Sequence, residues 1–129
     1  MNKYKVFVYG SLKNGYGNHS LLNGSEFINI ATTVDKFIMI DLGAFPAVID
    51  FGNDNDRNTI SGELYLVNDT VLERLDQLEG HPDWYQRRVV NINNNGDNEN
   101  AYMYIMQEDS FQDITTLTVC DVSNGVYNW

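Results

Sequence analysis

A single stretch of the chain, residues 68–80, has the periodicity of an amphipathic helix, so the fold must be built mostly from strands. Asn68 or Thr70 can cap this helix, and Thr70 with Glu73 has the spacing of a capping box. Gly80, closely followed by a proline, predicts its end. The apolar side chains recur on one helical face: Val71, Leu72, Leu75 and Leu78.

The other patterned segments are those of short strands. Residues 93–100 are polar and predict a hairpin loop, and residues 19–22 predict a short helical turn. No repeat or linker interrupts the pattern, so we expect one domain over residues 1–129, of class α+β with a curved or closed mixed sheet. Runs of β-branched and aromatic residues predict strands at 6–9, 27–34, 37–42, 47–51, 59–67, 88–92 and 101–106.

Charge and composition exclude several function classes. The 129 residues include 18 acids and 8 Lys and Arg, a net charge of −10, so nucleic-acid phosphates and anionic membranes would be repelled. No apolar run approaches the ~20 residues of a membrane span, and the N-terminus has no secretory pattern, so we expect a soluble cytoplasmic protein. The one cysteine, Cys120, lies in an apolar run and is expected to be a small buried hydrophobe. Two histidines leave little for a metal site.

The first candidate site is the end of the first strand, Tyr9-Gly10-Ser11-Leu12. A strand that stops at glycine turns its backbone N–H groups out of the ladder, where they can hold an anion or an oxyanion. The alternative is a plain turn.

The second candidate is Glu79, which follows the apolar Leu78 at the predicted helix end. A carboxylate there faces the negative pole of the helix, and local burial would raise its pKa further, which makes a proton acceptor near neutral pH. The alternative is a solvated glutamate. A triad of Ser11, His81 and Glu79 can be drawn, but Ser11 lacks the flanking glycines of a nucleophile elbow. We expect His81, which precedes a proline, to be a structural or surface residue.

The third candidate is the segment that enters the next strand. Tyr85 can close a pocket wall or donate a hydrogen bond, and Arg87 or Arg88 can bind a carboxylate bidentately. The alternative for the arginines is pairing with surface acids of the chain itself.

Taken in order, these motifs resemble the γ-glutamylcyclotransferase-like family, and within it they look most like the γ-glutamylamine cyclotransferases. The resemblance spans nearly the whole chain, and it is strongest at residues 75–87. Its blocks are Val8–Lys13 with Gly15 and Asn18, Gly43–Ala47, Gly62–Tyr65, Leu75–Arg87, Tyr102, and Gly125 with Trp129.

The resemblance implies a small mixed β-barrel with a few surrounding helices and a pocket for a small γ-glutamyl substrate. In such enzymes the α-amine of the γ-glutamyl group attacks its own γ-carbonyl, giving 5-oxoproline and a free amine or amino acid. The resemblance also implies that Glu79 is the general acid/base and that no metal or organic cofactor takes part. Arg87 is kept as a structural residue. The substrate-binding candidates are the loop residues Tyr9, Gly10, Ser11 and Leu12 and the wall residues Tyr85 and Tyr102.

Two other functions remain open, because a fold alone does not fix a function. One is a protein that binds or sequesters a small molecule on the same scaffold without turnover. The other is an interaction module, which would need a sizeable exposed apolar patch. Nothing in the sequence points to an obligate partner, so we expect a monomer.

Overall fold

The structure is a computed structural model that describes residues 2–10, 12–15, 17–111 and 116–129. Its helical elements are α1 (Asp69–Glu79) and the 3-10 turns η1 (His19–Leu22), η2 (Asp54–Asp56) and η3 (Glu108–Ser110). Its strands are β1 (Lys3–Val8), β2 (Glu26–Thr33), β3 (Ile38–Asp41), β4 (Pro46–Ile49), β5 (Thr59–Asn68), β6 (Tyr85–Asn94), β7 (Asp97–Met106), β8 (Val122–Ser123) and β9 (Val126–Tyr127).

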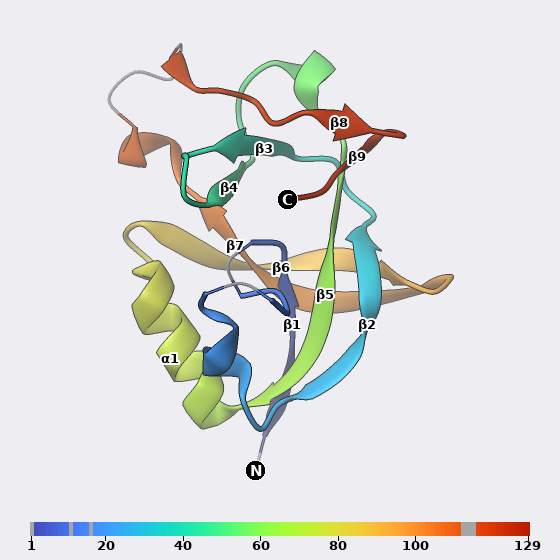
Figure 1. Cartoon of the computed structure of the whole chain (residues 1–129), viewed down its shortest axis with the longest axis vertical. Coiled ribbons are helices and arrows are strands. Elements are labelled where there is room, and N and C mark those ends of the chain that lie inside the picture. Colours follow the sequence, from blue (N-terminus) through green and yellow to red (C-terminus); the bar gives the residue numbers. More distant parts are fainter. Residues whose placement is uncertain (1, 11, 16, 112–115) are drawn as a thin grey trace.

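Five strands close into a mixed barrel in the order β1-β7-β6-β2-β5, because β5 also pairs with β1. The β1–β7 pair is parallel and the other four pairs are antiparallel. This confirms the expected α+β class and small mixed barrel, with one α-helix and short 3-10 turns in the described residues. Figure 1 shows β5 running from the end of the molecule where β8 and β9 lie to the end where α1 begins.

A close backbone approach closes the barrel at Gly62, in the middle of β5. A Cβ atom added there would lie 2.4 Å from the carbonyl oxygen of Val8 and 2.6 Å from the ring of Phe7. The glycine that interrupts the strand pattern is therefore required by the contact between β5 and β1.

Helix α1 begins and ends where the sequence predicts. Asn68, and not Thr70, is the N-cap, and its side chain accepts a hydrogen bond of 2.9 Å from the N–H of Val71. Gly80 follows the last turn in the left-handed conformation, with φ of +66°, which glycine adopts without steric cost.

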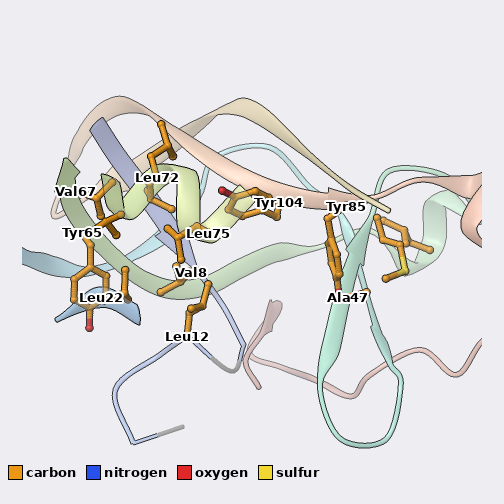
Figure 2. Packing of buried hydrophobic residues seen from close by; sticks show 14 of the residues in the cluster. Val8, Leu12, Leu22, Ala47, Tyr65, Val67, Leu72, Leu75, Tyr85 and Tyr104 are labelled. Carbon is orange, nitrogen blue, oxygen red and sulfur yellow. The ribbon is translucent and has the colours of Figure 1, made fainter. Parts of the chain in front are cut away.

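Two apolar clusters fill the molecule. One joins α1 and η1 to β1, β5 and the β3–β4 hairpin, and in Figure 2 Leu72 and Leu75 lie beside Val8 and Tyr104. The other contains Phe7, Leu64 and Met103 and packs against β3 and β4. Both faces of β1 are thus buried, which explains its continuous apolar run.

Two expectations for the chain are corrected. The polar segment 93–100 is a tight hairpin and not a long loop, because β6 and β7 stay paired up to Asn94 and Asp97 and the chain reverses at Asn95 and Gly96 with positive φ. Strands β8 and β9 lie in the tail, where no strand is predicted; β9 runs parallel to the start of β5. Among the described residues, no helix has the length and apolar character needed to cross a membrane.

Candidate active site

A cavity of about 170 Å³ opens where the loop after β1, the end of α1 and the start of β6 meet. It is bounded on its other sides by the turn before β4 and by β7. Its lining consists of Phe7, Val8, Tyr9, Gly10, Leu12, Asn18, Phe45, Pro46, Leu78, Glu79, Trp84, Tyr85 and Tyr104.

Glu79 is the last residue of α1 and lies in this lining. Burial raises the pKa of its carboxyl from 4.5 to about 7. The direction is the one expected from the sequence, and its cause is desolvation, which disfavours the charged form of a carboxyl group. Near neutral pH both protonation states of Glu79 are therefore populated, which is the property of a group that takes up and returns a proton.

The loop after β1 supplies one side of the cavity through Tyr9, Gly10 and Leu12, while Ser11 lies outside the described residues. Gly10 is pressed against Pro46, since an added Cβ atom would lie 3.0 Å from two carbons of the proline ring. The N–H of Lys13 donates to the carbonyl of Gly10 at 2.9 Å, so the loop is a closed turn.

The side chain of Lys13 connects this loop by hydrogen bonds to the last two residues of the described chain. Its buried ammonium donates to the carbonyl oxygen of Trp129 at 2.8 Å and to Oδ1 of Asn128 at 3.3 Å. Burial lowers the pKa of this ammonium. From the other side, Nδ1 of His19 lies 2.9 Å from the carbonyl oxygen of Leu12.

Two tyrosine hydroxyls in the lining are bonded to the backbone. Tyr9 donates to the carbonyl of Tyr104 at 2.7 Å and accepts from the N–H of Val48 at 3.2 Å. Tyr85 donates to the carbonyl of Pro46 at 3.3 Å. Burial, with a smaller contribution from the nearby charge of Glu79, raises the pKa of both hydroxyls, so both remain protonated at neutral pH and can keep donating these hydrogen bonds.

Tyr102, expected in the pocket wall, does not line the cavity; Tyr104 does. The two residues share one face of β7, but two residues along a strand are about 6.6 Å apart. Tyr102 instead packs against the ring of Tyr4 and lies under the guanidinium of Arg87, 4.7 Å from its ring centre.

The arginines pair with acids of the chain. Arg87 Nη1 donates to Asp76 Oδ2 at 2.5 Å, and Arg88 Nη2 donates to Asp50 Oδ2 at 3.1 Å. The N–H of Arg87 also donates to Nδ1 of His81 at 2.9 Å. These contacts agree with a structural role for Arg87 and His81.

Sequence reasoning missed several lining residues. Leu78 was expected on the buried face of the helix, yet its exposed fraction is 39% and it borders the cavity. Trp84, next to the predicted Tyr85, is 46% exposed and also borders it. The sequence signal that could have identified Leu78 and Trp84 is that both are apolar and lie close to Glu79 in the chain, one before it and one after it. Asn18 and Phe45 lie outside the helices and strands, and Pro46 is the first residue of β4, so no periodicity predicts the direction of these side chains.

Cys120 is half-buried and packs against the second apolar cluster. Burial raises the pKa of its thiol to about 11, so little of the reactive thiolate forms at neutral pH. Within the described ranges, no three His, Cys, Asp or Glu side chains are grouped so as to hold a metal ion.

A carboxyl group with a near-neutral pKa, set in a small and mainly apolar cavity of a mixed barrel, is the arrangement of a small-molecule acid–base site. Residues 6–125 match the family described as gamma-glutamyl cyclotransferase, AIG2-like, and the chain belongs to this family.

Two named relatives illustrate the match. The chain is 39% identical over 106 residues to the protein named "Putative gamma-glutamylcyclotransferase" from Methanocaldococcus jannaschii, covering 80% of this chain and 84% of the relative. It is 37% identical over 109 residues to gamma-glutamylaminecyclotransferase A of Danio rerio, covering 77% of this chain and 66% of that protein.

Among solved structures, the chain resembles an AIG2-like protein from Mus musculus. The TM-score is 0.79 at 23% identity, and the likeness covers 96% of this chain and 90% of the mouse protein. At that identity the likeness establishes the fold, which is the barrel described above.

Proposed function

We propose that this chain is a γ-glutamyl cyclotransferase in which Glu79 is the general acid/base. Its substrate is a γ-glutamyl amide, of which a γ-glutamylamine is the leading candidate, and its products are 5-oxoproline and a free amine or amino acid. The observation that carries the proposal is the near-neutral pKa of Glu79 within the cavity. The family and the names of its relatives support the same reaction.

The reaction needs little more than positioning and proton transfer. The α-ammonium gives a proton to the Glu79 carboxylate, and the freed lone pair bonds to the γ-carbonyl carbon. The tetrahedral intermediate then collapses: the C–N bond of the amide breaks, and the leaving nitrogen takes its electron pair and the proton held by Glu79. The surplus proton of the ring nitrogen ends on the released amine, so no co-reactant is needed.

The proposed attack is intramolecular, so holding the substrate in position accounts for much of the expected rate. Well-oriented attack of a tethered nucleophile reaches effective molarities of ~10⁵–10⁸ M. The cavity of about 170 Å³ that places Glu79 beside the hydrogen-bonded rings of Tyr9 and Tyr85 is where we expect the γ-glutamyl group to be held for this attack. Backbone N–H groups of the loop that contains Gly10, Ser11 and Leu12 are our candidates for binding the substrate carboxylate or the oxyanion.

The test is formation of 5-oxoproline. The purified protein and its Glu79→Gln variant are incubated with γ-glutamyl-ε-lysine, several γ-glutamyl amino acids and glutathione, and mass spectrometry follows 5-oxoproline and the released amine. Glu73→Gln is the matched control, because Glu73 is an exposed glutamate of the same helix. We expect product from the parent chain and the control and its loss in Glu79→Gln.

Full turnover by Glu79→Gln would contradict the role of this carboxyl group. If no compound gives product but some raise the melting temperature, the chain is a binding protein on the same scaffold.

A further inference from the structure

We propose that Trp84 and Leu78 form a subsite that selects the leaving group of the substrate by apolar contact. This inference rests on the proposed cyclotransferase reaction and adds to it the residues that determine specificity. Both side chains border the cavity, with exposed fractions of 46% and 39%. Leu78 directly precedes Glu79 in α1, and Trp84 follows it by five residues.

The backbone of Trp84 is held firmly although its ring is half exposed. Its N–H donates to the carbonyl of Gly80 at 2.9 Å, and its own carbonyl accepts from the N–H of Gln107 at 3.4 Å and from the hydroxyl of Ser110 at 3.3 Å. Its Cβ atom packs so closely on Gly80 that a side chain there would approach it to 3.1 Å. The indole ring lies 5.6 Å from the ring of Tyr85.

A tryptophan fixed in this way would be covered by the chain if its role were packing. Instead it extends the wall of Tyr85 toward solvent beside Glu79. In the proposed reaction Glu79 protonates the leaving nitrogen, so the group attached to that nitrogen must lie close to Glu79. Of the lining residues that the structure describes, Leu78 and Trp84 are the exposed ones, and both lie close to Glu79 in the chain.

The chemistry of this surface indicates how it selects. Among the lining residues in the described part of the chain, Glu79 alone carries a charge. Selection by Leu78 and Trp84 therefore depends on buried apolar area, and each methylene of the leaving group that contacts them should raise kcat/KM about fourfold. The subsite suits an amine with an extended aliphatic or flat aromatic part.

The experiment measures kcat/KM for γ-glutamyl ethylamide, n-butylamide, n-hexylamide and benzylamide. For the parent chain we expect kcat/KM to rise with chain length, by about fourfold per methylene until the subsite is filled. In Trp84→Ala the rise should fall below twofold per methylene, with a smaller reduction in Leu78→Ala. Trp84→Phe keeps a ring and should retain most of the length dependence.

Val89→Ala is the matched control, since Val89 is an exposed apolar residue of β6 that does not line the cavity. It should leave the length dependence unchanged. Circular dichroism shows which variants are folded, and Leu78→Ala provides the comparison if Trp84→Ala is not. A flat profile in the parent chain, or the slope of the parent chain in every folded alanine variant of Trp84 and Leu78, would overturn the inference.

The measurements distinguish an error in the proposed reaction from an error in the proposed subsite. If the parent chain forms no 5-oxoproline from any amide, the reaction is wrong, and calorimetric titration with the same amides then tests the subsite. Affinity that rises with chain length and flattens in Trp84→Ala would support it. Equal affinities along the series, or no binding of any amide, would contradict it.

Discussion

The hydroxyl of Tyr104 donates a hydrogen bond of 2.7 Å to Oδ1 of Asp76 and so joins β7 to α1. The other carboxylate oxygen of Asp76 accepts a hydrogen bond from Arg87. The backbone carbonyl of Asp76 accepts one from the N–H of His81 at 2.9 Å. Asp76 thus binds the barrel wall with its side chain and the turn after the helix with its backbone. Glu79 lies three residues after Asp76 in the chain, so this network fixes the end of α1 that carries the Glu79 carboxyl.

We expect Tyr104→Phe to lower the free energy of unfolding by about 1–2 kcal/mol. Tyr104 is 3% exposed, and the change removes a partly buried hydrogen bond to a carboxylate while keeping the ring. Urea titration of the variant and the parent chain measures the difference. Tyr102→Phe is the matched change on the same strand face and leaves the Asp76 network intact. Equal losses in the two variants would contradict the importance of the Tyr104–Asp76 bond.

Much of the fold could be predicted because its signals are local. The ends of α1 follow from Asn68 and Gly80, and the barrel strands follow from their β-branched and aromatic runs. Strands β8 and β9 could not be predicted, because each has two residues and β9 exists only through its pairing with β5 and β8. The prediction for residues 93–100 was wrong because asparagine is typical of loops, whereas here the pairing between β6 and β7 holds most of the segment in strands.

The candidate site, too, could be predicted only where its signals are local. The position of Glu79 at a helix end is readable from the sequence, but its burial depends on Tyr85 and the loop after β1, which meet it only in the fold. The face of β7 could be predicted, but the position along it could not, so Tyr102 was expected where Tyr104 lies. No local signal places a turn residue such as Phe45 in a cavity.

We expect Gly62→Ala to destabilise the chain by about 3 kcal/mol. The new methyl group would overlap the carbonyl oxygen of Val8 and the ring of Phe7, so β5 and β1 must separate. Thermal and urea unfolding measure the loss. Gly17→Ala is the control, because an added Cβ atom there meets nothing within 4 Å. If both changes cost the same, the close approach of β1 and β5 does not require glycine.

The stability of the Glu79→Gln variant should depend on pH in a defined way. The folded pKa of Glu79 is about 7 and its unfolded value about 4.5, so between these values the folded chain binds more protons and its stability falls as pH rises. Glutamine has no such proton. The variant should therefore gain stability relative to the parent from pH 4.5 to 7, by on the order of 3 kcal/mol, and keep that gain above.

Urea titrations at pH 4.5, 6 and 8 measure this difference. Glu73→Gln, measured beside it, controls for the removal of one negative charge from α1. A Glu79→Gln gain that is the same at all three pH values would show that Glu79 does not titrate near neutrality.

The rate of the proposed reaction should rise with pH through the same pKa. Only the carboxylate form of Glu79 accepts a proton from the substrate ammonium, so kcat/KM should increase about tenfold per pH unit below 7 and level off above it. Initial rates of 5-oxoproline formation between pH 3.5 and 8.5 give the profile. The residual activity of Glu79→Gln should lack this ascending limb, since the titrating group is gone. A limb centred near pH 4.5 in the parent chain would mean that burial does not raise the pKa of this carboxyl, and the cavity would then lack its proton acceptor of near-neutral pKa.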